Sequence, residues 1–327
     1  MFLGDRHRVA ILNRRKEYTL KGEMEGPTAL NTEQLHAWTS EAMTHARSGQ
    51  LPDYIPRLSR ASPHWFALQI TGVDGQTHTL GDSCLEFPLM SIVKPFLLLY
   101  LLCQWGEESV FKRVGIEPSS EPYNSLSQLQ HDQGWPRNPM INSGAITLAS
   151  ILSETDSTSG YQSLWNWLNY YGHCQLFLDE RMLASVKSFP NPRNEAIARE
   201  LATRGHLTEA VSALDTYNRL CCLSGTIVDI AHLGMLLLEC PPPLQSSHCH
   251  TVKALMTTCG LYQASGRFAV QVGLPTKSGV SGAVLSVVPH LGVIACYSPP
   301  LNREGNSVAG LFMVEQIAKA LDLSIFS

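Results

Sequence analysis

Charged residues are scarce in this sequence, and neither sign predominates. Only 16% of the residues are Asp, Glu, Lys or Arg, and 24 basic side chains against 28 acidic ones give a net charge of −4. A protein whose main partner is nucleic acid or an anionic membrane needs an excess of basic charge. The composition therefore argues against both partners, and the length of 327 residues allows an ample core.

Long hydrophobic runs are also missing. The longest, residues 95–103, is too short to cross a bilayer and predicts a buried helix. The N-terminus shows no charged region followed by an apolar stretch and a cleavage site. We therefore expect a cytoplasmic protein that contacts no membrane.

Paired cysteine motifs are absent as well. The nine cysteines are an odd number, and their spacing contains no C-x-x-C pair and no disulfide framework of the kind found in small domains. This number and spacing of cysteines favour a protein of a reducing compartment. The triplet His248-Cys249-His250 has no second pair of ligands, so we interpret it as a polar loop rather than a metal site.

The predicted elements suggest one catalytic domain, residues 31–327, after a loosely ordered N-terminal leader, residues 1–30. Asn31 has the form of a helix N-cap, and the following helix should end before Gly49. Five runs rich in β-branched or aromatic residues predict strands. They are residues 66–71, 76–80, 268–272, 283–288 and 293–297.

The middle of the chain has mostly helical spacing, and a last helix is predicted at about residues 308–321. Strands near both ends with helices between them predict an α+β fold. We expect a mixed sheet flanked by helices, formed by residues of about 51–95 and 240–327. Residues of about 96–239 would form an inserted helical subdomain, with the active cleft between the two parts.

Ser91 and Lys94 form an S-x-x-K motif at a predicted helix start. Pro95 is tolerated only in the first turn of a helix, so the apolar run after it places Ser91 near the N-terminus. Lys94 then lies one turn along on the same face, where an uncharged amine can take the serine proton. The motif occurs in serine acyl-transfer enzymes. A capping serine followed by a solvated lysine is the alternative interpretation.

Two further stretches carry groups suited to a binding site. Asn138 and Asn142 flank Pro139, and their amides offer both donors and acceptors to a ligand, although a capped helix start explains them too. Lys277-Ser278-Gly279 resembles the K-T-G element that accompanies S-x-x-K in penicillin-recognising serine enzymes. The two motifs together are much less expected by chance than either alone.

From about Leu51 to Phe326 the chain resembles the serine-dependent, β-lactamase-like glutaminases. The segments that carry this resemblance are residues 53–56, 91–94, 113–119, 138–146 and 193–194, Tyr217 with Cys221, residues 259–262 and 272–280, residues 298–299, and residues 305–307. The resemblance implies the serine β-lactamase/DD-peptidase-like fold and hydrolysis of L-glutamine to L-glutamate and ammonia, without metal or organic cofactor. It also implies a homodimer or homotetramer.

The resemblance implies roles for individual residues. Ser91 corresponds to the nucleophile, Lys94 to its base and Tyr262 to the tyrosine that shuttles protons. The backbone N–H groups of Ser91 and Val280 would form the oxyanion hole. The remaining residues that correspond to substrate contacts are Tyr54, Asn142, Asn194 and Tyr217.

The sequence departs from the family pattern at the nucleophile and at the substrate's amino end. Met90 precedes Ser91, where the family has glutamine. A family glutamate that contacts the amino end aligns with Lys187, or with Val186 if one residue is inserted. If Lys187 faced the ligand, it would repel an α-ammonium group. Glu180 or Glu195 could substitute through a loop shift.

These departures leave other functions to be tested. A penicillin-recognising peptidase is disfavoured by the missing export signal and by the segments around Asn142 and Tyr262. An altered amide substrate, or a protein of this fold that binds a metabolite without turnover, is favoured by the missing glutamate. The retained Ser91, Lys94, Tyr262 and Lys277 favour an enzyme, since a binding protein has no chemical need for all four.

Overall fold

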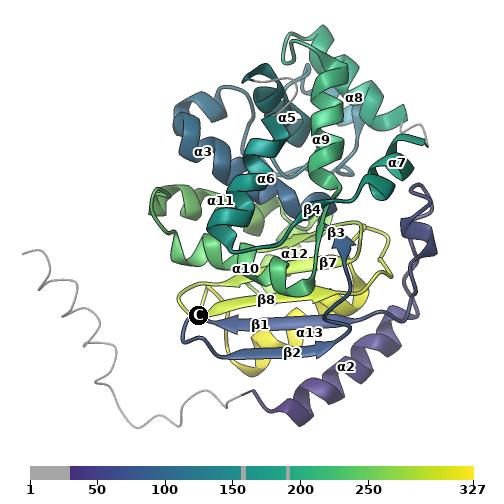
Figure 1. The fold of residues 1–327 in the computed structure, drawn as a ribbon, viewed down its shortest axis with the longest axis vertical. Coiled ribbons are helices and arrows are strands. Elements are labelled where there is room, and N and C mark those ends of the chain that lie inside the picture. The colour runs from purple at the N-terminus through teal and green to yellow at the C-terminus, as the bar shows by residue number, and fades with distance from the viewer. Residues whose placement is uncertain (1–29, 156–159, 189–191) are drawn as a thin grey trace, which may run out of the picture.

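The computed structural model describes residues 30–155, 160–188 and 192–327 (Figure 1). The predicted leader lies outside these residues except for its last position. The longer helices are α2 (Thr32–Ala46), α3 (Val93–Phe111), α5 (Asn142–Thr155), α6 (Gly160–Gly172), α7 (Glu180–Ser188), α8 (Pro192–Thr203), α9 (Ala210–Cys221), α10 (Ile227–Glu239), α11 (Ser246–Cys259) and α13 (Val308–Ala320). The shorter ones are α4 (Leu126–His131), α12 (Ser265–Gln271) and the 3-10 turns η1 (Leu58–Arg60), η2 (Met90–Ile92) and η3 (Tyr262–Ala264).

The main sheet joins the two ends of the chain. Its five strands, in the order β2-β1-β8-β7-β6, are β2 (Thr77–Gly81), β1 (Ala67–Gly72), β8 (Gly292–Tyr297), β7 (Ala283–Val288) and β6 (Thr276–Ser278). Every pairing in this sheet is antiparallel. The predicted α+β fold class is thus confirmed, although the sheet that we expected to be mixed is antiparallel throughout. A second sheet, in the order β3-β5-β4, is formed by β3 (Phe87–Pro88), β5 (Leu223–Gly225) and β4 (Phe177–Leu178).

Both faces of the main sheet are covered by helices. On β7, Leu285 and Val287 join the core beneath α10, whereas Val284 and Val288 join the core beneath α2 and α13. Side chains alternate between the faces of a strand, so burial on both faces gives an unbroken apolar run. Figure 1 shows α2 and α13 on one side of the sheet and α10 with α11 on the other.

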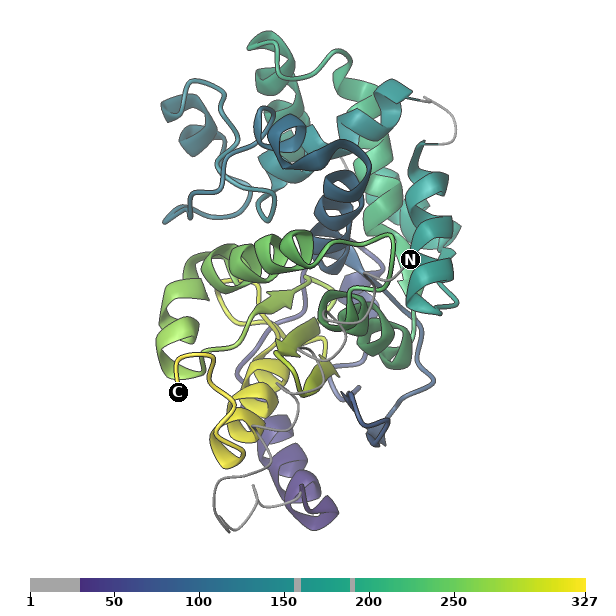
Figure 2. The same ribbon diagram turned by 90° about the vertical axis from the view of Figure 1, so that its left-hand side faces the viewer.

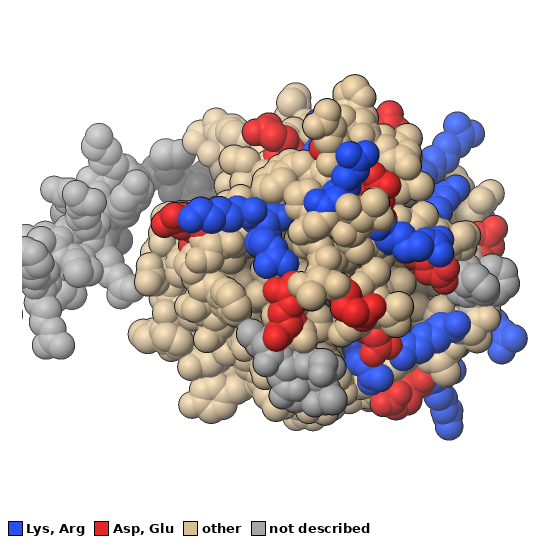
Figure 3. Space-filling view, turned by 90° about the horizontal axis from the view of Figure 1, so that it is seen from above, with Lys and Arg blue, Asp and Glu red and all other residues tan. Residues whose placement is uncertain are grey.

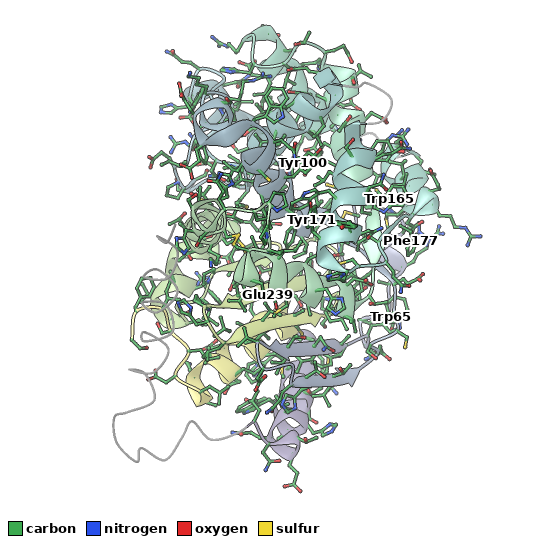
Figure 4. The ribbon with its side chains drawn as sticks, turned by 60° about the vertical axis from the view of Figure 1, so that its left-hand side comes forward. Trp65, Tyr100, Trp165, Tyr171, Phe177 and Glu239 are labelled. Atoms are coloured by element: carbon green, nitrogen blue, oxygen red, sulfur yellow. A yellow bond between two sulfur atoms is a disulfide. The ribbon has the colours of Figure 1, made fainter. Side chains whose placement is uncertain are left out.

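The helices between β3 and β5 form a block stacked on the sheet-bearing part, as Figure 2 shows. An aromatic contact joins two of its helices: Tyr100 of α3 packs against Trp167 of α6, with ring centroids 5.5 Å apart. Tyr171, also of α6, packs against the same Trp167 ring at 5.4 Å, and Figure 4 labels both tyrosines. On the outer end of the molecule in Figure 3, basic and acidic side chains are intermingled. No helix in the described part of the chain is long and apolar enough to cross a membrane.

Two sequence predictions were wrong. Residues 268–272, predicted as a strand, belong mostly to helix α12. The buried Phe268 and Val272 are one helical turn apart, and Val270 between them is 88% exposed. This spacing fits both a helix and an alternating strand, and only the exposure of Val270 distinguishes them.

The triplet predicted as a polar loop, residues 248–250, lies in α11 instead. His248 and Cys249 are buried, and Cys249 forms a disulfide with Cys240 at the end of α10. The spacing of the cysteines gave no reason to pair these two. The disulfide connects the helix that covers the sheet to the next helix along the chain.

A close approach at Gly260 yields the first testable prediction. A Cβ atom on Gly260 would lie 1.9 Å from the backbone oxygen of Thr276 and 2.4 Å from that of Met256. Because these are backbone atoms, Gly260→Ala should lower the free energy of unfolding by about 1–3 kcal/mol. Urea titration measures the change.

Gly266 provides the matched control. It lies in α12, and a Cβ atom there would meet nothing within 4 Å. Gly266→Ala should leave stability unchanged or raise it by up to about 1 kcal/mol. Equal effects of the two variants would contradict the close packing of α11 against β6.

Candidate active site

Ser91 occupies a short turn that the surrounding backbone holds tightly. It lies in η2, directly before α3, which places it at a helix start as predicted. Met90 has a φ of 47°, in the left-handed region that non-glycine residues seldom adopt. A Cβ atom on Gly279 would lie 2.8 Å from the Leu89 backbone oxygen, so the K-S-G segment passes directly against this turn. Strain of this kind persists where the surrounding structure enforces it.

Lys94 is completely buried beneath this turn. Its Nζ donates hydrogen bonds to the Met140 backbone oxygen, at 3.2 Å, and to Asn142 Oδ1, at 2.7 Å. Burial disfavours the charged amine and lowers the pKa of Lys94 to about 7. A substantial fraction of the amine is therefore uncharged near neutral pH, as a general base requires. The solvated lysine of the alternative interpretation is excluded.

The Asn142 side chain connects three helices. Its Oδ1 accepts hydrogen bonds from Lys94 and from the Tyr217 hydroxyl, at 3.1 Å, while its Nδ2 donates to Asn194 Oδ1, at 2.8 Å. All four side chains are buried. Because the amide group supplies both an acceptor and a donor, it fixes residues from α3, α8 and α9 relative to one another.

Tyr262 approaches Ser91 from the other side. It forms hydrogen bonds with the Ser91 side chain and with the Ser278 backbone oxygen, the latter at 3.3 Å. Burial raises the pKa of Tyr262 well above its usual value, so the hydroxyl keeps its proton. Its φ of 58° is a second left-handed backbone angle in the site.

Lys277 is a second buried lysine close to Tyr262. Its Nζ lies 4.6 Å from the centre of the Tyr262 ring and donates to the backbone oxygens of Gly260 and Ser278. Burial, together with the charge of Lys94, lowers the pKa of Lys277 well below its usual value. Two buried lysines with depressed pKa values thus belong to the surroundings of Asn142 and Tyr262.

A cavity of about 360 Å³ opens above these groups. Six of the sequence-predicted site residues line it: Tyr54, Ser91, Asn142, Asn194, Tyr217 and Val280. Lys94 and Tyr262 do not line it themselves but are hydrogen-bonded to Asn142 and Ser91, which do. The fold therefore brings all eight predicted residues together. In the described part of the chain, no cluster of His, Cys, Asp and Glu could hold a metal ion.

The position of Lys187 removes one concern raised by the sequence. Its Nζ pairs with the Asp215 carboxylate, which also pairs with Arg219. Lys187 does not line the cavity, but Val186 does. The possibility that Lys187 faces the ligand is therefore contradicted, and the apolar Val186 lines the cavity at this point of the chain. Neither Glu180 nor Glu195 lines the cavity in its stead.

Sequence reasoning missed Tyr123, a central part of the cavity wall. Its hydroxyl lies 3.2 Å from that of Tyr54, and its ring centroid is 4.5 Å from that of Tyr262. It belongs to the segment between α3 and α4, where it follows residues 113–119 but is not itself part of a recognisable motif. A lone aromatic residue between polar residues in a proline-containing loop was the only signal.

Comparisons with known proteins agree with this geometry. A family model described as glutaminase matches residues 49–326. The glutaminase of Synechocystis is 47% identical over 294 residues, which cover 89% of this chain and 90% of that protein. The solved structure of the probable glutaminase YbaS has a TM-score of 0.84 at 34% identity, covering 91% of this chain and 100% of that one.

A second solved structure contains a bound compound. It is the covalent complex between a Bacillus subtilis glutaminase and 5-oxo-L-norleucine, formed by reaction with 6-diazo-5-oxo-L-norleucine. Its TM-score is 0.81 at 29% identity, and the match covers 90% of this chain and 99% of that one.

The ion pair of Lys187 can be tested by a double-mutant cycle. Lys187 and Asp215 are 42% and 37% exposed, and pairs this exposed contribute about 0.2–1 kcal/mol. We expect a coupling energy in that range from the unfolding of Lys187→Gln, Asp215→Asn and the double variant. A coupling energy of zero would leave Lys187 free to turn toward the cavity.

Proposed function

This chain belongs to the glutaminase family, and from that premise we propose that it hydrolyses the side-chain amide of L-glutamine through an acyl-enzyme on Ser91. The observation that carries the proposal is the buried Lys94, with its pKa of about 7, beneath a serine that lines the cavity. The products are L-glutamate and ammonia. No metal or organic cofactor is needed for these steps.

In the acylation step, the Ser91 hydroxyl oxygen attacks the amide carbon while Lys94 accepts its proton. The oxygen of the tetrahedral intermediate carries the negative charge, and the backbone N–H groups of Ser91 and Val280 stabilise it. Removing one such donor typically costs about 2.7–4 kcal/mol. Both residues line the cavity, which supports their placement near the reacting atom.

Collapse of this intermediate breaks the carbon–nitrogen bond, and the nitrogen must gain a proton to leave as ammonia. Tyr262 is the donor that we propose, because its protonated hydroxyl is hydrogen-bonded to Ser91. The proton that Lys94 took from Ser91 balances the one that Tyr262 gives up, so Tyr262 regains its proton when Lys94 returns to the uncharged form. Water then attacks the acyl carbon, with proton transfers in the reverse direction, and releases L-glutamate.

The polar side chains of the cavity would hold the rest of the substrate. Tyr54, Asn142, Asn194 and Tyr217 all line the cavity and supply hydroxyl and amide groups for the amino-acid end. This arrangement supports the substrate-binding roles that the family resemblance implies.

We also propose that the protein is cytoplasmic and forms a homodimer or homotetramer. Its resemblance to an oligomeric family supports the assembly, which sedimentation can test. The Cys240–Cys249 disulfide is unusual for a reducing compartment. Mass spectrometry of the protein alkylated in intact cells can determine whether this bond forms there.

Loss of Ser91 tests the proposed activity. Purified wild-type protein should release ammonia from L-glutamine at millimolar concentration, and Ser91→Ala should release less by a factor of about 10⁴ or more, since the nucleophile is removed. Activity that survives in Ser91→Ala would contradict the acyl-enzyme. A wild type as silent as the variant would contradict the glutaminase proposal and favour binding without turnover.

The pKa of Lys94 predicts how the activity depends on pH. Because the base must be uncharged, kcat/KM should fall about tenfold per pH unit below about 7 and level off above it. Lys94→Arg, which stays protonated, should be inactive at every pH. Asn142→Asp should move the acid limb to higher pH, because a carboxylate favours the charged lysine. A profile that is flat from pH 5.5 to 8 would exclude Lys94 as the base.

A further inference from the structure

The charged side chains beside the cavity fall into two groups. In the first group, the Asp215 carboxylate pairs with both Lys187 and Arg219. None of these three residues lines the cavity. The two cations therefore share the single Asp215 carboxylate, and none of the three side chains is directed at a ligand in the cavity.

Asp53 and Arg193 form the second group. Both line the cavity, and they are the only charged residues among the described residues that do so. Neither forms an ion pair with another residue in the described part of the chain. One carboxylate and one guanidinium group are thus available to a ligand in a single cavity.

The two charges act on opposite members of a tyrosine pair. Burial raises the pKa of Tyr54, and the negative charge of Asp53 adds to this effect. Burial likewise raises the pKa of Tyr123, but the positive charge of Arg193 opposes it. The hydroxyls of Tyr54 and Tyr123 lie 3.2 Å apart. Asp53 and Arg193 therefore both act on this tyrosine pair, and both belong to the lining of the same cavity.

A free amino acid has the complementary charges, an ammonium and a carboxylate group on one carbon. An ammonium group taken out of water needs a negative partner. Val186, in the cavity wall, cannot provide one, and Asp53 is the carboxylate of the described lining that can.

We propose that Asp53 is the residue that binds the α-ammonium group of the substrate, while Arg193 binds its α-carboxylate. This inference rests on the proposed function, since it assigns the amino-acid end of the same site. It makes Asp53 a specificity residue for free α-amino acids in a chain whose cavity wall has Val186 instead of a carboxylate.

The test measures equilibrium binding, so it does not depend on turnover. Ser91→Ala serves as the background, and calorimetry compares L-glutamine with 4-carbamoylbutanoate, which has the same amide and carboxylate but no ammonium group. Asp53→Asn should weaken L-glutamine about fivefold, as expected for a partly exposed ion pair, and leave 4-carbamoylbutanoate unchanged. Asp53→Glu should recover part of the loss.

Arg193→Gln and Asp322→Asn provide the contrasts. Arg193→Gln should weaken both ligands, because both carry the carboxylate. Asp322→Asn removes an exposed carboxylate after α13, outside the cavity lining, and should change neither affinity.

The inference is overturned if Asp53→Asn weakens both ligands equally or leaves L-glutamine unaffected. The proposed function fails by a different result, namely no ammonia release by the wild type. The binding measurements do not depend on ammonia release, so the two failures can be told apart.

Discussion

The burial of Lys94 is the constraint on which the rest of this site depends. An amine fully removed from water is costly in its charged form, so it either finds partners or loses its proton. Here the partners are two oxygen acceptors, Met140 O and Asn142 Oδ1, and no carboxylate contacts the amine in the described part of the chain. Neutral acceptors of this kind fix the position of the amine, but they stabilise its protonated form less than a carboxylate would. The burial of Lys94, which costs stability, thus yields a base at neutral pH.

The hydrogen bonds of Asn142 join helices within the helical block, and the site also needs groups from the sheet-bearing part. Lys94 comes from the helix after the nucleophile turn, whereas Tyr217 and Asn194 come from helices far along the chain. Tyr262 and Lys277 come from the sheet-bearing part on the other side. Each group alone would be an unsatisfied buried polar side chain, and together they satisfy one another.

Backbone strain is concentrated at the same place. Met90 and Tyr262 both adopt left-handed φ angles, and each adjoins a residue of the proposed reaction. The close packing of Gly279 against the Leu89 backbone leaves the nucleophile turn little room to relax. Such strain is common where side chains must be held in one orientation. Met90, directly before Ser91, is therefore held by backbone geometry, and it lines the cavity.

The sequence by itself determined the helix start at Ser91 and the strands with unbroken apolar runs, because these depend on local spacing and motif, whereas the eight candidate site residues followed from the resemblance to a known family. Only the tertiary structure decided what residues 268–272 become, since Phe268 and Val272 fit two periodicities and packing against α11 selects the helix. It also decided which of Val186 and Lys187 faces the cavity. Neighbouring residues on a helix point in different directions, and the ion pair with Asp215 holds Lys187 away.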